Sequence, residues 1–209
     1  FSKVLFALAK EYECPLIGGD TTAGPLTISI TAFGNTPSGK AIRRSGAIAG
    51  DDIWVSGCVG DARLALAALR HEISLSSEDL QQIEHRMHQP SPRVELGLQL
   101  RDIASAALDI SDGLLGDLRH ILRQSQVEAQ IELDKLPKSA TLQKQDIAIQ
   151  NQFAACGGDD YEICFTAAPS QRDKIEGIAK TLNLPLTLIG KILPRAGAEV
   201  KMNLLDASG

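Results

Sequence analysis

The sequence has few aromatic residues and no excess of positive charge. Aromatic residues make up 4% of the 209 residues and hydrophobic residues 44%, so Leu, Ile, Val and Ala must build most of the core. Lys and Arg (21) are outnumbered by Asp and Glu (26), the formal net charge is −5, and no basic stretch offsets it. Binders of nucleic acid or of anionic membranes need the opposite balance, so we expect neither partner.

Cysteines and long apolar runs are also scarce. The four cysteines form no CxxC pair, which disfavours a zinc site and predicts reduced thiols in the core; they are Cys14, Cys58, Cys156 and Cys164. No apolar run approaches the roughly 18–20 residues that cross a bilayer, and no signal peptide is visible. We therefore expect a cytoplasmic protein.

The first 40 residues combine a helical pattern, two strand patterns and a turn-rich segment. Apolar spacing predicts a helix over 1–12, and short apolar or alternating runs predict strands at 15–17 and 26–33. The turn-rich stretch GNTPSGK covers 34–40. Because Phe1 already lies inside the helical pattern, we expect this chain to be a fragment of a longer protein.

We place a domain boundary at the turn-rich stretch. Residues 1–35 are then the C-terminal remnant of an N-terminal α/β domain, and residues 36–209 form a C-terminal α+β domain. In the latter, helices and strands are interspersed without a regular βαβ rhythm, which predicts a mixed sheet flanked by helices. The patterns predict strands at 52–56, 108–111, 129–133, 162–167 and 186–192, helices at 62–69, 93–107, 113–123 and 171–182, and a short helix with a loop in 71–92.

The turn-rich stretch also fits GxxxxGK, the beginning of a P-loop. However, Ala41 stands where a P-loop has Ser or Thr, and no clear helix follows. A P-loop needs a helix N-terminus to present its backbone amides to phosphate. We therefore interpret this stretch as a linker.

Three segments place carboxylates beside glycines at expected strand ends: GGDTT (18–22), DISDG (109–113) and GGDDYE (157–162). Carboxylates bind Mg²⁺, and glycine lets the backbone approach a phosphate closely. Each segment alone is also compatible with ordinary turns or a helix cap. Together, their carboxylates would repel one another unless cations separate them, which favours magnesium with substrate phosphates. These carboxylates are Asp20, Asp109, Asp112, Asp159, Asp160 and Glu162.

Basic residues and histidines narrow the chemistry further. Arg43 and Arg44 form a compact basic pair near such a site, and a guanidinium can bind two phosphate oxygens. A solvated surface pair is the alternative. No histidine neighbours a nucleophile-like motif, so a histidine-based catalytic site is disfavoured.

The motifs GGDTT, RRSGA, DISDGL and GGDDYE, in this order, resemble the thiamine-monophosphate kinase family. That family lies in the superfamily of aminoimidazole ribonucleotide synthetase and selenophosphate synthetase. PSPRVELG and SGCVGDA are similar to this family as well, so the resemblance covers essentially the whole chain. It implies an N-terminal α/β domain that dimerises, a C-terminal α+β domain, and an active site in the cleft between them.

The resemblance also implies roles for individual residues. Asp109 and Asp112 would bind Mg²⁺ together with Asp20, and Asp159 would contact thiamine phosphate. The nucleotide would be bound by Gly19, Asp20, Arg44 and Ser111. Further parts of the site, an N-terminal acidic stretch and a C-terminal tail, would lie outside this chain, so the fragment alone would hold only part of the site.

The implied reaction is direct, in-line phosphorylation of thiamine monophosphate by ATP, with several Mg²⁺ ions, in thiamine diphosphate biosynthesis. The full-length protein would be a homodimer. The acceptor phosphate is mostly ionised near neutral pH, so no general base is expected. Three alternatives stay open. The first is another ATP-dependent member of the superfamily acting on a different small molecule, and the second is a magnesium-dependent phosphohydrolase that releases phosphate from ATP without an acceptor. The third is a non-catalytic nucleotide-binding or dimerisation fragment.

Overall fold

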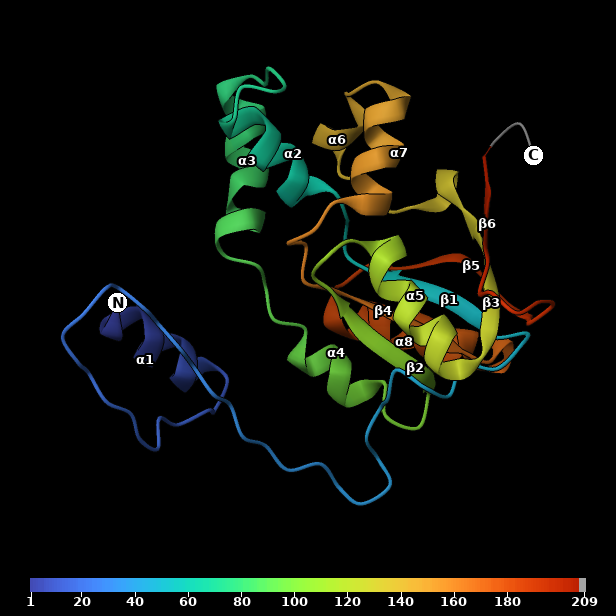
Figure 1. Cartoon of the computed structure of the whole chain (residues 1–209), viewed down its shortest axis with the longest axis horizontal. Helices are drawn as coiled ribbons and strands as arrows, with labels where there is room; N and C mark the ends of the chain where they lie inside the picture. Colours follow the sequence, from blue (N-terminus) through green and yellow to red (C-terminus); the bar gives the residue numbers. More distant parts are fainter. Residues whose placement is uncertain (207–209) are drawn as a thin grey trace. The chain divides into compact units, whose positions relative to one another are not determined.

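The computed structural model describes residues 1–206 and consists of two compact units. The first unit is 1–38, and the second begins at Gly39 (Figure 1). The division therefore falls inside the turn-rich segment 34–40, close to the predicted domain boundary. None of the helices among the described residues is long and apolar enough to cross a membrane.

The first unit contains one helix, α1 (Ser2–Glu11), as predicted. The two predicted strands were wrong, because 12–38 contains no strand. Its alternating apolar side chains are exposed, with Leu26 at 92% and Phe33 at 80%. A strand is stable only beside another strand, and the described part of this unit offers no neighbour. The alternating pattern therefore has no sheet to join here.

The second unit is built on a six-stranded sheet in the order β2-β4-β1-β5-β3-β6. All neighbouring strands are antiparallel except β3 and β6, which are parallel, so the sheet is mixed. This confirms the predicted α+β class. The strands are β1 (Asp52–Ser56), β2 (Ala104–Ile110), β3 (Val127–Glu132), β4 (Glu162–Ala167), β5 (Leu186–Pro194) and β6 (Met202–Leu205).

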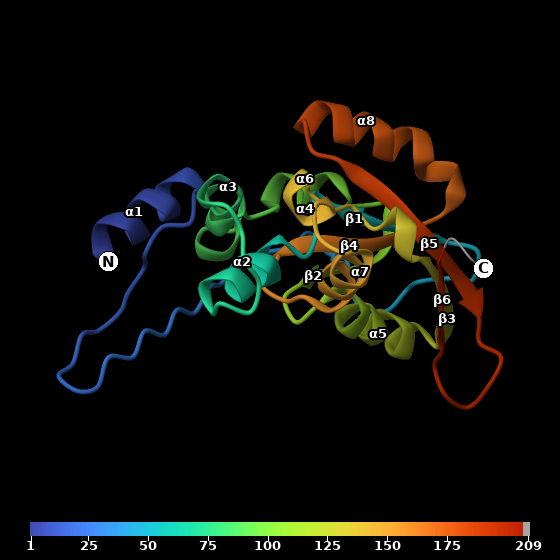
Figure 2. The same ribbon diagram turned by 90° about the horizontal axis from the view of Figure 1, so that it is seen from above.

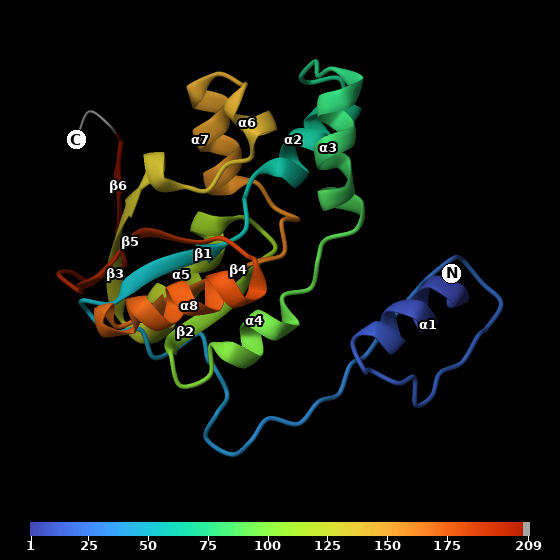
Figure 3. The same cartoon turned by 180° about the vertical axis from the view of Figure 1, so that it is seen from behind.

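Helices cover both faces of this sheet. Figure 2 shows α8 on one face and α5 on the other, and Figure 3 shows α8 and α4 from the opposite side. The helices are α2 (Asp61–Leu69), α3 (Ser77–His88), α4 (Val94–Gln99), α5 (Leu114–Ser125), α6 (Ala140–Gln143), α7 (Ile147–Cys156) and α8 (Arg172–Leu182). Two short 3₁₀ turns, Leu133–Lys135 and Pro169–Gln171, complete the unit.

Strand β1 shows why the core has two halves. All five of its residues are buried, and successive side chains point to opposite faces of the sheet. Ile53 and Val55 join the larger apolar cluster, with α2, α5 and α7. Trp54 joins the smaller cluster, with α4 and α8, and stacks on Phe165 with ring centroids 6.3 Å apart.

Several predictions in this unit were wrong in detail. The predicted helix over 93–107 ends at Gln99, and β2 already begins at Ala104. Periodicity does not separate a short apolar strand from a helix, and pairing with β4 decides the outcome. Helix α7 and strand β6 were missed. All four thiols are free, but only Cys164 is buried in the core, whereas Cys14 and Cys156 are exposed.

Candidate functional site

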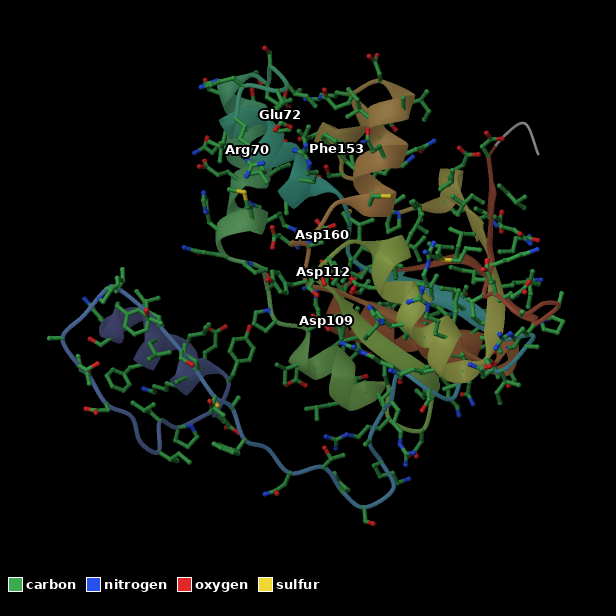
Figure 4. All side chains as sticks on the ribbon, in the orientation of Figure 1. Arg70, Glu72, Asp109, Asp112, Phe153 and Asp160 are labelled. Carbon is green, nitrogen blue, oxygen red and sulfur yellow. The ribbon has the colours of Figure 1, made fainter. Side chains whose placement is uncertain are left out.

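Two acidic loops meet at one end of the sheet. The first, 111–113, links β2 to α5, and the second, 157–161, links α7 to β4. They meet because β2 and β4 are antiparallel neighbours in which Ile110 is paired with Glu162. Figure 4 shows Asp109, Asp112 and Asp160 at this edge. The structure thus brings the predicted DISDG and GGDDYE segments together.

Backbone hydrogen bonds join the two loops directly. The N–H of Asp159 donates to the carbonyl of Ser111 over 2.9 Å, and the N–H of Tyr161 donates to the carbonyl of Ile110 over 2.8 Å. Asp159 and Tyr161 adopt left-handed backbone conformations, with φ of 66° and 51°. Non-glycine residues adopt such conformations only where the surrounding structure enforces them, and functional loops are a common place for this.

Glycine at position 113 permits the close approach of the first loop to α7. Its φ is 112°, and a Cβ atom there would lie 2.6 Å from the carbonyl oxygen of Cys156. Gly158 in turn lies against the first loop, where a Cβ would be 2.8 Å from the Ser111 carbonyl oxygen. A side chain at either position would push the two acidic loops apart.

Three carboxylates at this edge face the solvent: those of Asp109, Asp112 and Asp159. Within residues 1–206 these carboxylates accept no hydrogen bond and form no ion pair. Unpaired carboxylate oxygens are the donor chemistry that Mg²⁺ prefers. The residues present therefore fit a magnesium ion.

Three other acidic residues lie beneath them: Asp117, Asp160 and Glu162 are buried and bound by the protein. Asp160 is 2% exposed and accepts the Gly60 N–H over 2.7 Å, just before α2. Burial raises the pKa of Asp160 to about 7. The expectation that all six acidic residues need cations between them was wrong for Asp160 and Glu162, because protein donors bind both.

Glu162 is neutralised by two arginines. Arg93 donates to both of its carboxylate oxygens, over 2.7 and 2.5 Å, and Arg86 donates to Oε1 over 2.6 Å. The Ser56 hydroxyl donates to Oε2 over 2.6 Å. A buried carboxylate is tolerated when its charge is paired and its oxygens are satisfied. Glu162 therefore fixes the end of the second loop to β1, α3 and the start of α4.

Sequence reasoning missed Asp117, Arg86 and Arg93. Arg93 lies in PSPRVELG, which resembled the family but suggested no partner. Asp117 follows DISDG by four residues, in the first turn of α5, where an acidic residue is usual and draws no notice. The position of Asp117, one helical turn after the loop, could have suggested that its carboxylate accepts hydrogen bonds from the loop backbone.

Arg44 lies away from the acidic loops within the second unit. Its carbonyl accepts the hydroxyl of Ser125, the last residue of α5, over 3.5 Å. Asp112 lies two residues before the first residue of the same helix, at the opposite end from Ser125. A 12-residue helix is about 18 Å long. The structure does not bring the Arg44 backbone to Asp112, so its role as a nucleotide contact stays a prediction.

The other predicted nucleotide residues divide between the units. Gly19 and Asp20 belong to the first unit, where an Asp20 carboxylate oxygen accepts the N–H of Thr21 over 2.7 Å. Ser111 lies in the first acidic loop of the second unit, beside Asp112. The assignments of Gly19, Asp20 and Ser111 stay predictions.

The acidic loops do not form a complete metal cage by themselves. Residues 1–206 contain no group of three or more His, Cys, Asp or Glu side chains placed to hold a metal ion. Mg²⁺ is usually bound by one or two carboxylates together with substrate phosphates and water, so such a cage is not required. Asp20, Asp109 and Asp112 stay predicted ligands.

The P-loop alternative finds no support in the second unit. No helix occurs between residues 41 and 51. Lys40, which would contact phosphate in a P-loop, pairs with Asp102 over 2.7 Å. The segment therefore lacks the helix N-terminus that a P-loop requires.

The second unit thus combines a mixed sheet with two acidic loops that are hydrogen-bonded to each other. The chain belongs to the AIR synthase related family, because the model of that family's C-terminal domain matches residues 49–203. The resemblance to thiamine-monophosphate kinases that the motifs indicated is confirmed by similarity to individual members of that family.

One such relative is the thiamine-monophosphate kinase of Salmonella typhimurium, 43% identical over 194 residues, which cover 92% of this chain and 60% of the relative. The crystal structure of the Stenotrophomonas maltophilia thiamine-monophosphate kinase matches with a TM-score of 0.90 and 44% identity, covering 98% of this chain and 65% of that one. A structure of AaThiL complexed with AMPPCP and TMP matches with a TM-score of 0.64 and 27% identity, covering 80% and 51%. The chain thus spans about 60% of the length of the curated relatives it matches first.

Proposed function

We propose that the whole protein containing this chain transfers the γ-phosphoryl group of ATP to thiamine monophosphate and so forms thiamine diphosphate. The observation that carries this proposal is the set of three exposed, unpaired carboxylates at the end of β2 and on the two hydrogen-bonded acidic loops, in a chain similar to thiamine-monophosphate kinases. A relative bound to AMPPCP and TMP supports both substrates. The proposal includes the predicted homodimer and cytoplasmic location.

The chemical obstacle in this reaction is the approach of two anions. Each pair of unit charges 4 Å apart repels by about 4 kcal/mol at an effective dielectric of 20. When bound, Mg²⁺ would neutralise phosphate charge, and Asp109 and Asp112 would hold it with Asp20. Asp159 would orient thiamine phosphate, while Ser111 and Arg44 would contact the nucleotide with Gly19. Because the acceptor oxygen is already ionised, positioning and charge neutralisation carry the catalysis.

The test is to incubate the full-length protein with Mg-ATP and thiamine monophosphate and to measure thiamine diphosphate by chromatography. We expect product from the full-length protein and little from this fragment alone. A folded full-length protein that forms no thiamine diphosphate would overturn the proposal. Turnover with a different acceptor would then indicate another ATP-dependent reaction of the superfamily.

A further inference from the structure

We propose that Asp117 is a positioning residue that sets the geometry of the metal-binding loop; the proposal rests on the function proposed above. Asp117 lies in the first turn of α5 and is 6% exposed. Its Oδ2 atom accepts the backbone N–H groups of Ser111 and Asp112, each over 3.0 Å. One buried oxygen thus holds two consecutive peptide groups of the loop.

The same loop is held from its other side. The Ser111 carbonyl accepts the N–H of Asp159, so both backbone polar groups of Ser111 are engaged. Asp112, whose N–H also donates to Asp117, keeps an exposed carboxylate that has no partner within residues 1–206. The Asp117 carboxylate and the backbone N–H of Asp159 therefore fix the backbone from which the Asp112 carboxylate extends.

This arrangement determines which kind of ligand the loop accepts. Because the N–H groups of Ser111 and Asp112 both donate to Asp117, they are not available to phosphate oxygens. The polar side chains left without a protein partner among residues 1–206 are then Asp112 and Ser111 in the loop and Asp109 at the end of β2. A loop of this composition recruits a cation first, and phosphate through that cation.

A simpler interpretation is that Asp117 only caps the end of α5, as acidic residues in a first turn often do. The two interpretations differ in a measurable way. A cap contributes to the stability of the helix and leaves metal affinity unchanged. A residue behind a metal ligand changes metal affinity, typically about 10–100-fold when it is removed.

The test uses the full-length protein with Mn²⁺ as a probe for the magnesium site, in the presence of ATP. Free Mn²⁺ is measured by electron paramagnetic resonance, which requires no turnover. We expect Asp117→Ala to weaken Mn²⁺ binding about 10–100-fold. We expect Asp117→Asn to stay within about threefold of wild type, because both hydrogen bonds end on one oxygen and an amide oxygen can accept them. The exposed Asp134→Asn is the matched control.

Each outcome decides the question. Wild-type Mn²⁺ affinity in folded Asp117→Ala would show that Asp117 is only a helix cap. Equal losses of Mn²⁺ affinity in Asp117→Ala and Asp117→Asn would show that the charge of Asp117 matters, and not the position of its oxygen. If Asp117→Ala does not fold, Asp117→Glu keeps the charge but displaces the oxygen, and unchanged Mn²⁺ affinity there overturns the proposal. Absence of thiamine diphosphate from wild type would refute the proposed reaction alone, since the Mn²⁺ measurement is independent of the acceptor.

Discussion

Three exposed and three buried acidic residues lie at the end of the sheet where the two acidic loops meet, and their surroundings are opposite. Asp109, Asp112 and Asp159 at the surface have no protein partner among the described residues. Asp117, Asp160 and Glu162 beneath them are buried and accept hydrogen bonds from backbone groups or arginines. Acidic residues a few positions apart thus divide into exposed carboxylates without a partner and buried carboxylates that hold the backbone or arginines, and only the environment of each carboxylate distinguishes them.

Removal of Glu162 should give the largest effect on stability. Glu162→Ala leaves the largely buried Arg86 and Arg93 without their shared carboxylate, and breaking a buried pair costs about 3–5 kcal/mol. Urea unfolding should show this loss, whereas the exposed Asp134→Ala should change the free energy of unfolding by less than about 0.5 kcal/mol. A small change in the free energy of unfolding of Glu162→Ala would show that Glu162 does not support the second loop.

Asp160 should make stability depend on pH. Burial raises its folded pKa to about 7 from 3.8, so the unfolded chain binds fewer protons between about pH 4 and 7. The free energy of unfolding attributable to Asp160 therefore falls as pH rises through this window and is level above it. The fall should amount to a few kcal/mol, at about 1.4 kcal/mol per pKa unit. Chemical unfolding from pH 4 to 8 should show a shallower fall in Asp160→Asn, and identical profiles would contradict this assignment.

Asp112 should show the converse behaviour of a surface carboxylate. Asp112→Ala in the full-length protein should lower the rate of thiamine diphosphate formation by more than about 100-fold, beyond the range for residues behind metal ligands. Its unfolding temperature should match wild type, because no protein partner is lost. Asp134→Ala, measured at equal folded concentration, should retain wild-type activity. Wild-type rates in Asp112→Ala would refute the metal assignment.

Gly113 lies between the exposed Asp112 and the helix that carries the buried Asp117, and its substitution should have a smaller effect. Gly113→Ala places a Cβ near the Cys156 carbonyl in a left-handed conformation, with an expected loss of about 1–3 kcal/mol. Gly116→Ala, in the first turn of α5 where a Cβ would meet no atom within 4 Å, should be neutral or stabilising and is the matched control. Calorimetry of both variants checks this, and equal melting temperatures would show that the loops tolerate separation.

The sequence was sufficient to predict the α+β class, most elements of the second unit and the strand end and loop that carry Asp109 and Asp112. Those features depend on local patterns: apolar periodicity, and carboxylates beside glycine at strand ends. The supporting contacts are not local. Arg93 and Glu162 are 69 positions apart, and their pairing depends on where the strands and helices pack. For the same reason, sequence patterns alone could not separate the buried Asp160 from the exposed Asp159 next to it.

The backbone bonds of the two loops also predict their behaviour in hydrogen exchange. The amides of Ser111, Asp112, Asp159 and Tyr161 all donate within the second unit, although three of these four side chains are exposed. An amide exchanges only when its hydrogen bond opens, so these loops should exchange nearly as slowly as the strands they extend. Binding loops are more often among the least protected parts of a protein. A metal ion that binds here would therefore order little additional backbone, and its addition should leave the exchange rates of these four amides almost unchanged.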